Sequence, residues 1–194
     1  EKKIINYISN KFQLVEQYEI SWNKKNFAKS LTSFYGTNLP PNSKKELHCG
    51  NGKFMVITFY DKSPNYEFIE TSRGIENVNI NIFSMKQLFR EWTGGGHKIH
   101  TTNSTSETNH DLIILFGTNY EDYVKKVYLE DKLVKNEKKI IKYNPNNALG
   151  VDGWESLEKF FYAMNETLTY VVLRNFEKLP NKYNSNDHGD IDLL

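Results

Sequence analysis

The segment "KKIINYISNKFQLVEQYEISW", Lys2 to Trp22, changes its hydrophobic periodicity near its midpoint. In the first half, Ile4, Ile5 and Ile8 recur at the spacing of an amphipathic helix. From Phe12 onward, apolar residues alternate with polar ones, a pattern typical of a β-strand. A helix that leads directly into a strand predicts a mixed α+β fold.

Helices and strands are predicted in the same way along the chain to about residue 133. Residues 23–35 have helical spacing, with Asn23 as a candidate N-cap, and residues 83–92, 105–116 and 120–129 are also predicted helices. Ser104 or Thr105 is the expected N-cap of the helix at 105–116. "KFMVITFY", residues 53–60, predicts a buried strand, whereas 38–52 and 93–104 are rich in Gly, Pro and Asn and are predicted loops.

The composition changes after residue 133, which predicts three parts: a first domain at 1–133, a linker at 134–152 and the start of a second α/β unit at 153–194. In the last part, "WESLEKFFYAMNETL" predicts an amphipathic helix, and "TYVVLR" and "DIDLL" predict strands. The chain starts with Glu1 rather than Met and ends inside an apolar run. Both ends are therefore expected to be cuts through a longer protein.

The bulk composition limits the function classes. The 194 residues carry a net charge of +1 and no extended basic cluster, so no nucleic-acid partner is expected. No apolar run is long enough to cross a bilayer, so no membrane partner is expected. A single cysteine, Cys49, excludes an internal disulfide and favours a reducing compartment, which predicts a cytoplasmic protein.

Polar side chains gather in "GGGHKIHTTNSTSETNHDLIILFG", residues 94–117. Three hypotheses fit this stretch. The histidines His97, His100 and His110 offer metal ligands, although the spacing matches neither a zinc finger nor a helical zinc motif. The glycines could let a phosphate approach the backbone, but the Lys-Ser/Thr pair of a P-loop is missing. The third hypothesis is a nucleophilic histidine.

A phosphoryl-accepting histidine needs one free ring nitrogen, while a carboxylate or carbonyl holds the other nitrogen. His100 is followed, one short helix later, by Asp111, which can orient the ring. Lys86 and Arg90 supply positive charge for the phosphoryl oxygens.

These residues resemble the active-site segment of nucleoside diphosphate kinases. In that family the catalytic histidine precedes Gly-Ser-Asp-Ser and a helix that bears an orienting glutamate. "HKIHTTNSTSETNHDLIILF" aligns with it without a gap, placing His100 on the catalytic histidine and Asp111 on the orienting glutamate. Thr102 and Asn103 fall on the Ser and Asp of the family motif.

The resemblance covers roughly residues 3 to 130 and implies an antiparallel, ferredoxin-like sheet with helices. It implies that Tyr35 packs near the nucleotide phosphates, that Thr93 contacts them, and that Lys86 or Arg90 replaces the family's arginine. Nucleoside di- and triphosphates are then the expected partners, with Mg²⁺ as cofactor. Members of the family form hexamers or tetramers, so a homo-oligomer is a further expectation.

The chain departs from the family pattern at three places. His97 stands where the family has an asparagine that belongs to the nucleotide site. The family's loop with a second arginine, between the threonine and the histidine, is missing. The family's first strand, which carries a catalytic lysine, has no counterpart in these residues.

The end of the chain has a second resemblance. Asp190 and Asp192 are two residues apart in a predicted strand, so both carboxylates share one face and can hold Mg²⁺. With "YVVLRNFEKLP" they resemble the first strands of polymerase-β-type nucleotidyltransferases, especially members found with polysaccharide-synthesis proteins. The alternative function is therefore a catalytically inactive nucleotide-binding or regulatory module of a nucleotidyltransferase involved in polysaccharide synthesis.

Overall fold

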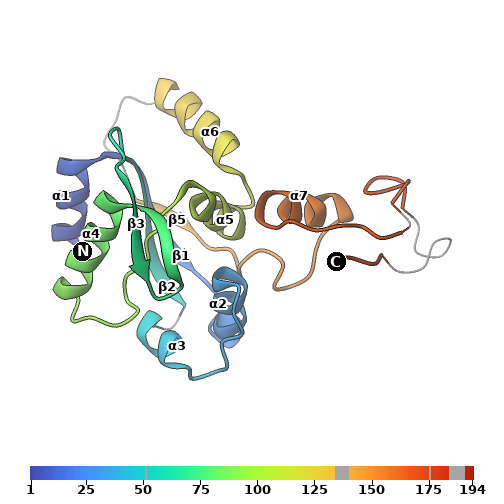
Figure 1. Cartoon of the computed structure of the whole chain (residues 1–194), viewed down its shortest axis with the longest axis horizontal. Coiled ribbons are helices and arrows are strands. Elements are labelled where there is room, and N and C mark those ends of the chain that lie inside the picture. Colours follow the sequence, from blue (N-terminus) through green and yellow to red (C-terminus); the bar gives the residue numbers. More distant parts are fainter. Residues whose placement is uncertain (51, 134–139, 175, 184–190) are drawn as a thin grey trace.

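The computed structural model of the chain describes residues 1–50, 52–133, 140–174, 176–183 and 191–194. A small sheet lies at its centre, with α1 and α4 on one side and α2 and α5 on the other (Figure 1). The elements in chain order are α1 (Lys2–Lys11), β1 (Gln13–Ser21), the 3-10 helix η1 (Lys24–Asn26), α2 (Phe27–Tyr35), α3 (Lys44–Cys49), β2 (Lys53–Tyr60), β3 (Tyr66–Thr71), β4 (Gly74–Asn79), α4 (Ile80–Trp92), α5 (Thr105–Phe116), α6 (Tyr120–Leu133), β5 (Ile141–Tyr143) and α7 (Leu157–Thr167).

The central sheet has the strand order β2-β1-β5. β1 and β2 are antiparallel, from the pair Gln13 and Tyr60 to the pair Ser21 and Lys53, whereas β1 and β5 are parallel. β3 and β4 form a separate antiparallel hairpin. The mixed α+β class predicted from the sequence is confirmed, whereas the ferredoxin-like arrangement stays a prediction.

A bulge in β1 divides the strand into two halves. Its register against β2 shifts between Leu14 and Glu16. Leu14 packs with α1 and α4, whereas Tyr18 and Ile20 belong to the cluster formed with α2 and α5. An extra residue in one strand reverses the alternation of its side chains. Apolar and polar residues therefore alternate in the sequence along the whole strand. The apolar residues nevertheless face opposite sides of the sheet before and after the bulge.

β2 is apolar on both faces because helices cover both sides of the sheet. Phe54 and Val56 pack against the α2/α5 cluster, and Ile57 and Phe59 pack against the α1/α4 cluster. A nearly continuous apolar run is typical of a strand covered on both faces. The predicted strand at 53–60 is confirmed, although its side chains are half-buried rather than buried.

The helices predicted within the first domain are present, with small changes at their ends. Asn23 accepts a hydrogen bond from the Lys25 amide and Ser104 accepts one from the Glu107 amide, as expected of N-caps. The predicted loop at 38–52 contains the short helix α3, which begins after the N-cap Ser43. The β3–β4 hairpin has no counterpart among the sequence predictions.

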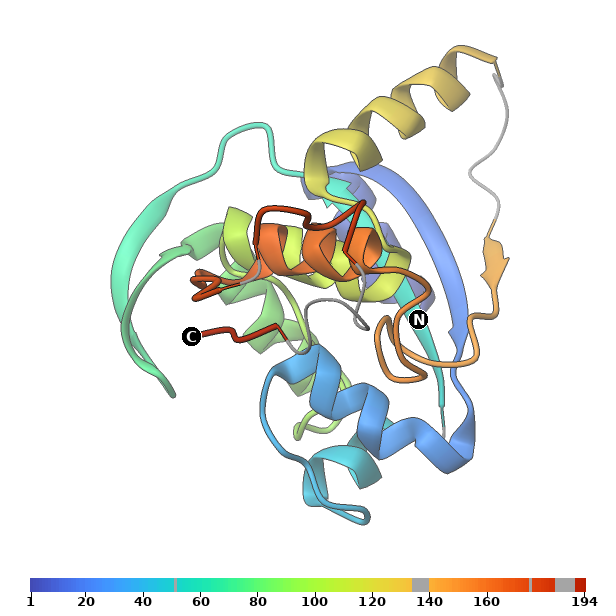
Figure 2. The same ribbon diagram turned by 90° about the vertical axis from the view of Figure 1, so that its right-hand side faces the viewer.

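The C-terminal part extends away from the sheet (Figure 1), and in the view from that end it lies in front of the central body (Figure 2). Helix α7 is present as predicted, and its residues pack against α5. The Asn109 amide group donates to the Glu166 backbone carbonyl at 3.0 Å, and the Tyr162 hydroxyl accepts from the Asn119 amide at 2.9 Å. Of the predicted linker, residues 141–143 form β5 beside β1. The division into 1–133, 134–152 and 153–194 stays a prediction.

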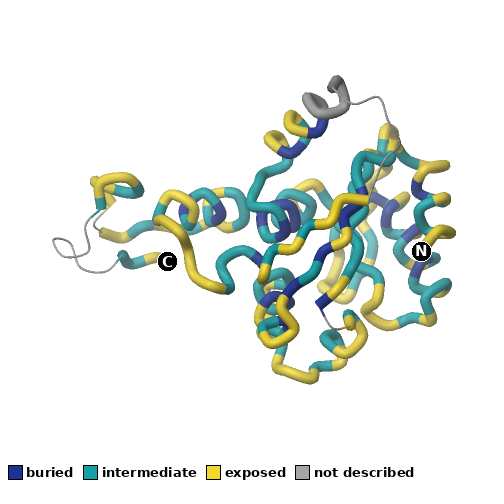
Figure 3. The backbone as a smooth tube through the Cα atoms, turned by 180° about the vertical axis from the view of Figure 1, so that it is seen from behind, coloured by how far each residue is buried: buried dark blue, intermediate teal, exposed yellow. Residues whose placement is uncertain are grey.

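The two predicted C-terminal strands form only a short ladder within the described residues. Val171 and Leu194 exchange backbone hydrogen bonds, and the Leu173 amide donates to the Asp192 carbonyl at 3.1 Å. An isolated bridge joins Val172 and Leu193. Exposed residues are more frequent here than in the central body, where buried residues concentrate (Figure 3).

Ile20 tests the importance of the α2/α5 cluster because its side chain is fully buried. We expect Ile20→Ala to lower the free energy of unfolding by about 2–5 kcal/mol, since the change leaves a cavity in packed surroundings. Urea denaturation followed by circular dichroism measures the loss. The matched control is Ile75→Ala, whose side chain is 76% exposed and whose removal should change stability by less than about 0.5 kcal/mol. Equal losses in both variants would contradict the described core.

Candidate functional site

His100 and Asp111 form a hydrogen-bonded pair between the α4–α5 connection and α5. His100 Nε2 lies 2.8 Å from Asp111 Oδ2. The Asp111 carboxylate accepts, so the hydrogen is on Nε2 and the lone pair of the neutral ring is on Nδ1. The side chain of Asp111 is 11% exposed and that of His100 is 25% exposed. The pair therefore has the geometry of a nucleophile and its orienting base.

His110 shares the same carboxylate. Its Nδ1 lies 3.2 Å from Asp111 Oδ1, so each oxygen of Asp111 faces an imidazole ring. The sequence pattern predicted His110 only as a possible metal ligand. A signal was present in the sequence, because His110 directly precedes Asp111 and lies on the same helix.

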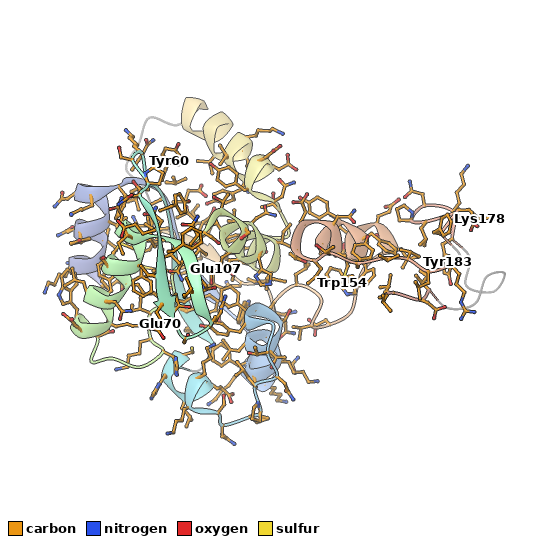
Figure 4. All side chains as sticks on the ribbon, viewed as in Figure 1. Tyr60, Glu70, Glu107, Trp154, Lys178 and Tyr183 are labelled. Atoms are coloured by element: carbon orange, nitrogen blue, oxygen red, sulfur yellow. The ribbon has the colours of Figure 1, made fainter. Side chains whose placement is uncertain are left out.

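The beginning of α5 fixes the position of Asp111. Ser104 Oγ accepts from the Glu107 amide at 3.2 Å, and Glu107 Oε2 accepts from the Asn103 amide at 2.7 Å. Ser104 and Glu107 therefore act as a capping box that ties the end of the connection to the first turn of the helix. Asp111 follows four residues after Glu107, about one turn further on (Glu107 is labelled in Figure 4).

Two aromatic rings from the end of α2 contact His100 edge-on. The ring centroids of Phe34 and Tyr35 lie 5.2 Å and 5.5 Å from the imidazole. Burial raises the pKa of the Tyr35 hydroxyl, and the nearby Cys49 and Asp111 act in the same direction. Lys45 Nζ lies 3.2 Å from the centre of the Tyr35 ring. Tyr35 is therefore a neutral wall of the site, and its place near nucleotide phosphates stays a prediction.

Lys86 and Arg90 approach the His100 segment from α4. Lys86 Nζ donates to the Thr101 carbonyl at 3.4 Å, and an Arg90 Nη2 hydrogen is directed at the Ile99 carbonyl at 3.5 Å. The two cations are four residues apart, so they lie on one face of the helix. Burial lowers the pKa of Lys86, and the Glu107 carboxylate opposes this effect. Both predicted cations thus flank the candidate nucleophile.

Three buried polar atoms in this region lack a hydrogen-bond partner within the described residues. They are Arg90 Nε, Thr101 Oγ1 and Asn103 Oδ1. Buried polar atoms without partners are uncommon in folded proteins because they lose their hydration. Thr102 is different, since its hydroxyl accepts from Thr108 Oγ1 at 2.8 Å. The connection therefore offers free hydrogen-bonding capacity directly after His100, at Thr101 and Asn103, and α4 offers more at Arg90.

The triple glycine forms the turn that the sequence predicted. Gly94, Gly95 and Gly96 have φ angles of 78°, 77° and 75°, a left-handed conformation that other residues rarely adopt in succession. At Gly96 a Cβ atom would lie only 2.8 Å from His48 Nδ1. The turn thus brings His97 beside His48, with the ring centroids 5.5 Å apart.

Thr93 and His97, at the two ends of this turn, differ in whether their side chains are already engaged. The Thr93 hydroxyl donates to the Phe89 carbonyl at 2.9 Å, so it is engaged at the end of α4. His97 is exposed, and partial burial together with the positive charges of Lys45, His48 and Arg90 lowers its pKa. The surroundings of His97 are therefore electropositive, which suits an anionic ligand.

A cavity of about 1030 Å³ connects most of these groups. The predicted site residues that line it are Tyr35, His97, His100, Thr102, Asn103 and Asp111. Lys86 and Arg90 reach its wall through the carbonyls of residues 101 and 99. The structure thus brings together the nine residues that the sequence predicted for the catalytic and nucleotide-binding site. Thr93 is one of them and lies at the edge of the group.

Compared with family models, curated proteins and solved structures, the chain matches none. The roles of these residues consequently rest on their geometry. Among the described helices, none is long and apolar enough to cross a bilayer.

The structure gives little support to the predicted metal sites. The described residues contain no group of three or more His, Cys, Asp or Glu side chains that could hold a metal ion. Asp192 forms an ion pair with Arg174, and Asp190 lies outside the described residues. A Mg²⁺ site at Asp190 and Asp192 stays a prediction, as does the nucleotidyltransferase resemblance that suggested it.

The Asp111 contact predicts a single tautomer of His100. We expect the neutral imidazole to carry its hydrogen on Nε2, because the Asp111 carboxylate accepts from that nitrogen. Asp111→Ala removes the acceptor and should give a mixture of tautomers. Long-range ¹H–¹⁵N NMR spectra of the imidazole nitrogens distinguish the two results.

The matched control for this experiment is Asp122→Ala. The Asp122 side chain is 56% exposed on α6, so the His100 spectrum should not change. An unchanged His100 spectrum in Asp111→Ala would show that the carboxylate does not fix the ring.

Proposed function

We propose that the protein is a phosphotransferase that moves a phosphoryl group between nucleotides through a phosphohistidine at His100. The observation that carries this proposal is the 2.8 Å contact between His100 Nε2 and Asp111 Oδ2. It leaves the Nδ1 lone pair available on a ring that lines a large cavity. The resemblance of residues 3–130 to nucleoside diphosphate kinases supports the same reaction.

In the first half of the reaction, His100 Nδ1 attacks the γ-phosphorus of a nucleoside triphosphate. A nitrogen–phosphorus bond forms while the bond from the γ-phosphorus to the β–γ bridging oxygen breaks. The nucleoside diphosphate leaves with that oxygen and its electron pair. The positive charge that develops on the imidazole is stabilised by Asp111 through the Nε2 hydrogen bond. A second nucleoside diphosphate then takes the phosphoryl group from Nδ1.

The remaining predicted residues bind the phosphates. Lys86 and Arg90 provide positive charge, and the free oxygens of Thr101 and Asn103 provide hydrogen-bonding capacity beside the nucleophile. Tyr35 and His97 form the adjacent walls, with Thr102 next to them. Thr93 contributes only if its hydroxyl exchanges the Phe89 carbonyl for a phosphate oxygen.

Magnesium belongs to this proposal as an ion carried by the substrate. Mg²⁺ commonly binds nucleotide phosphates and few protein groups. This fits a site whose described carboxylate, Asp111, already faces two imidazole rings. The ferredoxin-like fold belongs to the proposal as well. It is supported by the antiparallel β1–β2 pair and by the order of α1, β1, α2, β2 and α4, between which the short elements η1 and α3 and the β3–β4 hairpin are inserted.

The second candidate is an inactive nucleotide-binding module. It is favoured by one observation: the Lys86 ammonium and the Arg90 guanidinium both contact backbone carbonyls of the His100 segment. In that case the two cations hold the loop in place and the nucleotide binds without phosphoryl transfer.

Labelling separates the two candidates. After incubation with γ-³²P-ATP and Mg²⁺, we expect a protein-bound label that is labile in acid and stable in base, as phosphohistidine is. Mass spectrometry under alkaline conditions should locate it at His100, and His100→Gln should abolish it. Binding of ATP without any label supports the inactive module, and a label at another residue removes His100 from the nucleophile role.

Titration calorimetry with ADP tests the phosphate-binding role of Lys86. Lys86→Met keeps the aliphatic stem but removes the charge, so we expect ADP binding to weaken by roughly ten- to a hundredfold, the range of about 1.5–3 kcal/mol for a hydrogen bond to a charged group. Lys125→Met on α6 is the matched control, because Lys125 is 67% exposed and pairs with Asp122. Equal affinities in both variants would contradict a phosphate contact.

A further inference from the structure

The β3–β4 hairpin is attached to the connection that carries His100 and turns one face toward the body of the protein. At its base, the Asn79 amide donates to the Asn103 carbonyl at 2.9 Å. Val78 on its inner face is buried, whereas Phe68 on its outer face is 75% exposed. The hairpin forms one edge of the molecule (Figure 2). It is therefore a peripheral element whose base is tied directly to the candidate site.

The turn of the hairpin has a fixed backbone and carries a charged side chain, Arg73. Thr71 pairs with Gly74, so Ser72 and Arg73 make the turn between the two strands. The Arg73 amide donates to Thr71 Oγ1 at 3.1 Å, and the φ angle of Gly74 is 105°, a left-handed conformation that suits glycine. Arg73 Nη2 lies 3.6 Å from Glu107 Oε1 in the first turn of α5. The tip of the hairpin therefore reaches the start of the helix that carries Asp111.

The contact between Arg73 and Glu107 is a weak ion pair. The Arg73 side chain is 64% exposed, and within the described residues Glu107 is its only ion-pair partner. Exposed ion pairs contribute little to stability because water screens the two charges. Glu107 Oε2 accepts from the Asn103 amide at 2.7 Å, so Glu107 keeps its capping role when Arg73 leaves. The pair can therefore open without disturbing the start of α5.

Arg73 adds to the positive charge around the His100 segment. Burial lowers the pKa of Lys86 on α4, and the charges of Arg90 and Arg73 act in the same direction. Burial also lowers the pKa of Lys45 on α3, and the same two arginines lower it further. The Arg73 guanidinium thus belongs to a group of four cations. Like charges gathered in this way repel one another, and an anionic ligand relieves the repulsion.

The hydrogen-bonding groups among these cations suit a phosphate. Thr101 Oγ1 is buried without a partner within the part of the chain that the structure describes, and a hydroxyl can donate to a phosphate oxygen. A guanidinium presents a planar fork of donors that binds a phosphate through two parallel hydrogen bonds. Such a contact is stronger than the single 3.6 Å contact with Glu107. A phosphate is therefore a better partner for Arg73 than the carboxylate that it faces.

We propose that Arg73 is a further phosphate-binding residue and that Glu107 occupies its guanidinium until a nucleotide binds. The phosphates of a nucleoside di- or triphosphate take the place of the Glu107 carboxylate, and the tip of the hairpin moves with Arg73 toward the ligand. Glu107 is thus an internal competitor of the nucleotide. The inference rests on the proposed function as far as nucleotide binding and does not require phosphoryl transfer.

Titration calorimetry with ADP tests this exchange, because two variants should act in opposite directions. Arg73→Gln removes the guanidinium, so we expect ADP binding to weaken roughly ten- to a hundredfold, as for a lost hydrogen bond to a charged group. Glu107→Gln keeps an oxygen for the Asn103 amide but releases Arg73, so binding should strengthen by about two- to fivefold. In the double variant, Glu107→Gln should give little of this gain.

The matched control is Lys62→Gln. Lys62 is exposed in the β2–β3 connection, so the variant removes a positive charge close to the hairpin in sequence without touching the ion pair. We expect the ADP affinity to stay within about twofold of that of the unchanged protein, since salt screens an exposed charge at a distance.

Three results would overturn the exchange of Arg73 between Glu107 and phosphate. The first is an equal ADP affinity of Arg73→Gln and the unchanged protein. The second is weaker binding in both single variants, which would mean that the ion pair only holds the hairpin in place. The third is an undiminished gain from Glu107→Gln when the guanidinium is absent, which would reduce Glu107 to simple repulsion.

The labelling experiment distinguishes this inference from the proposed function. The expected affinity changes without a label on His100 would support the role of Arg73 and overturn phosphoryl transfer alone. Absence of ADP binding to the unchanged protein would overturn both.

Discussion

The bulge at Glu16 in β1 determines which helices can cover each side of the sheet. Thr58 Oγ1 accepts from the Glu16 amide at 3.0 Å, and the Glu16 carboxylate accepts from the Tyr123 hydroxyl at 2.8 Å. Tyr18 also donates to that carboxylate. These contacts hold the extra residue in β1, so that Tyr18 and Ile20 turn toward α5. The position of α5, and with it that of Asp111, follows from this choice of face.

The candidate site depends on two separate constraints that meet at His100. Ser104 and Glu107 fix the start of α5 and hence the position of the Asp111 carboxylate. Lys86 and Arg90 hold the backbone on either side of His100 from α4. The imidazole is therefore fixed from the helices on both sides of the sheet, while Phe34 and Tyr35 limit its rotation. A ring held in this way would lose little entropy in the proposed phosphoryl transfer.

Much of the first domain was predictable because its local signals agree with its packing. The helical and strand periods of residues 2–22, the N-cap Ser104 and the apolar run of β2 each led to the observed element. The pairing of His100 with Asp111 also followed from their spacing and from the family resemblance. Residues 61–79 show no clear hydrophobic periodicity, so the β3–β4 hairpin was not predicted. The six-residue helix α3 lies among loop-forming residues and was not predicted either.

Other features depend on tertiary contacts that no local pattern encodes. The bulge at Glu16 is stabilised by Thr58 and Tyr123, 42 and 107 residues away in the chain. Within the described residues, the predicted strands at 169–174 and 190–194 form only a short ladder with one bridge, since an isolated pair of strands needs further strands to become a sheet. The engagement of Thr93 and the second imidazole on Asp111 likewise appear only once the helices are packed.

The Asn109 side chain connects the C-terminal part of the chain to the helix that carries Asp111. Its amide group donates to Glu166 on α7, and its carbonyl accepts from the Tyr120 amide at the start of α6 at 2.8 Å. Both contacts can exist together only when α5, α6 and α7 keep their present arrangement. Asn109 lies two residues before Asp111, so the helix that carries the Asp111 carboxylate is also tied to α6 and α7. One side chain thus joins three helices at the element that carries the hydrogen-bond partner of His100.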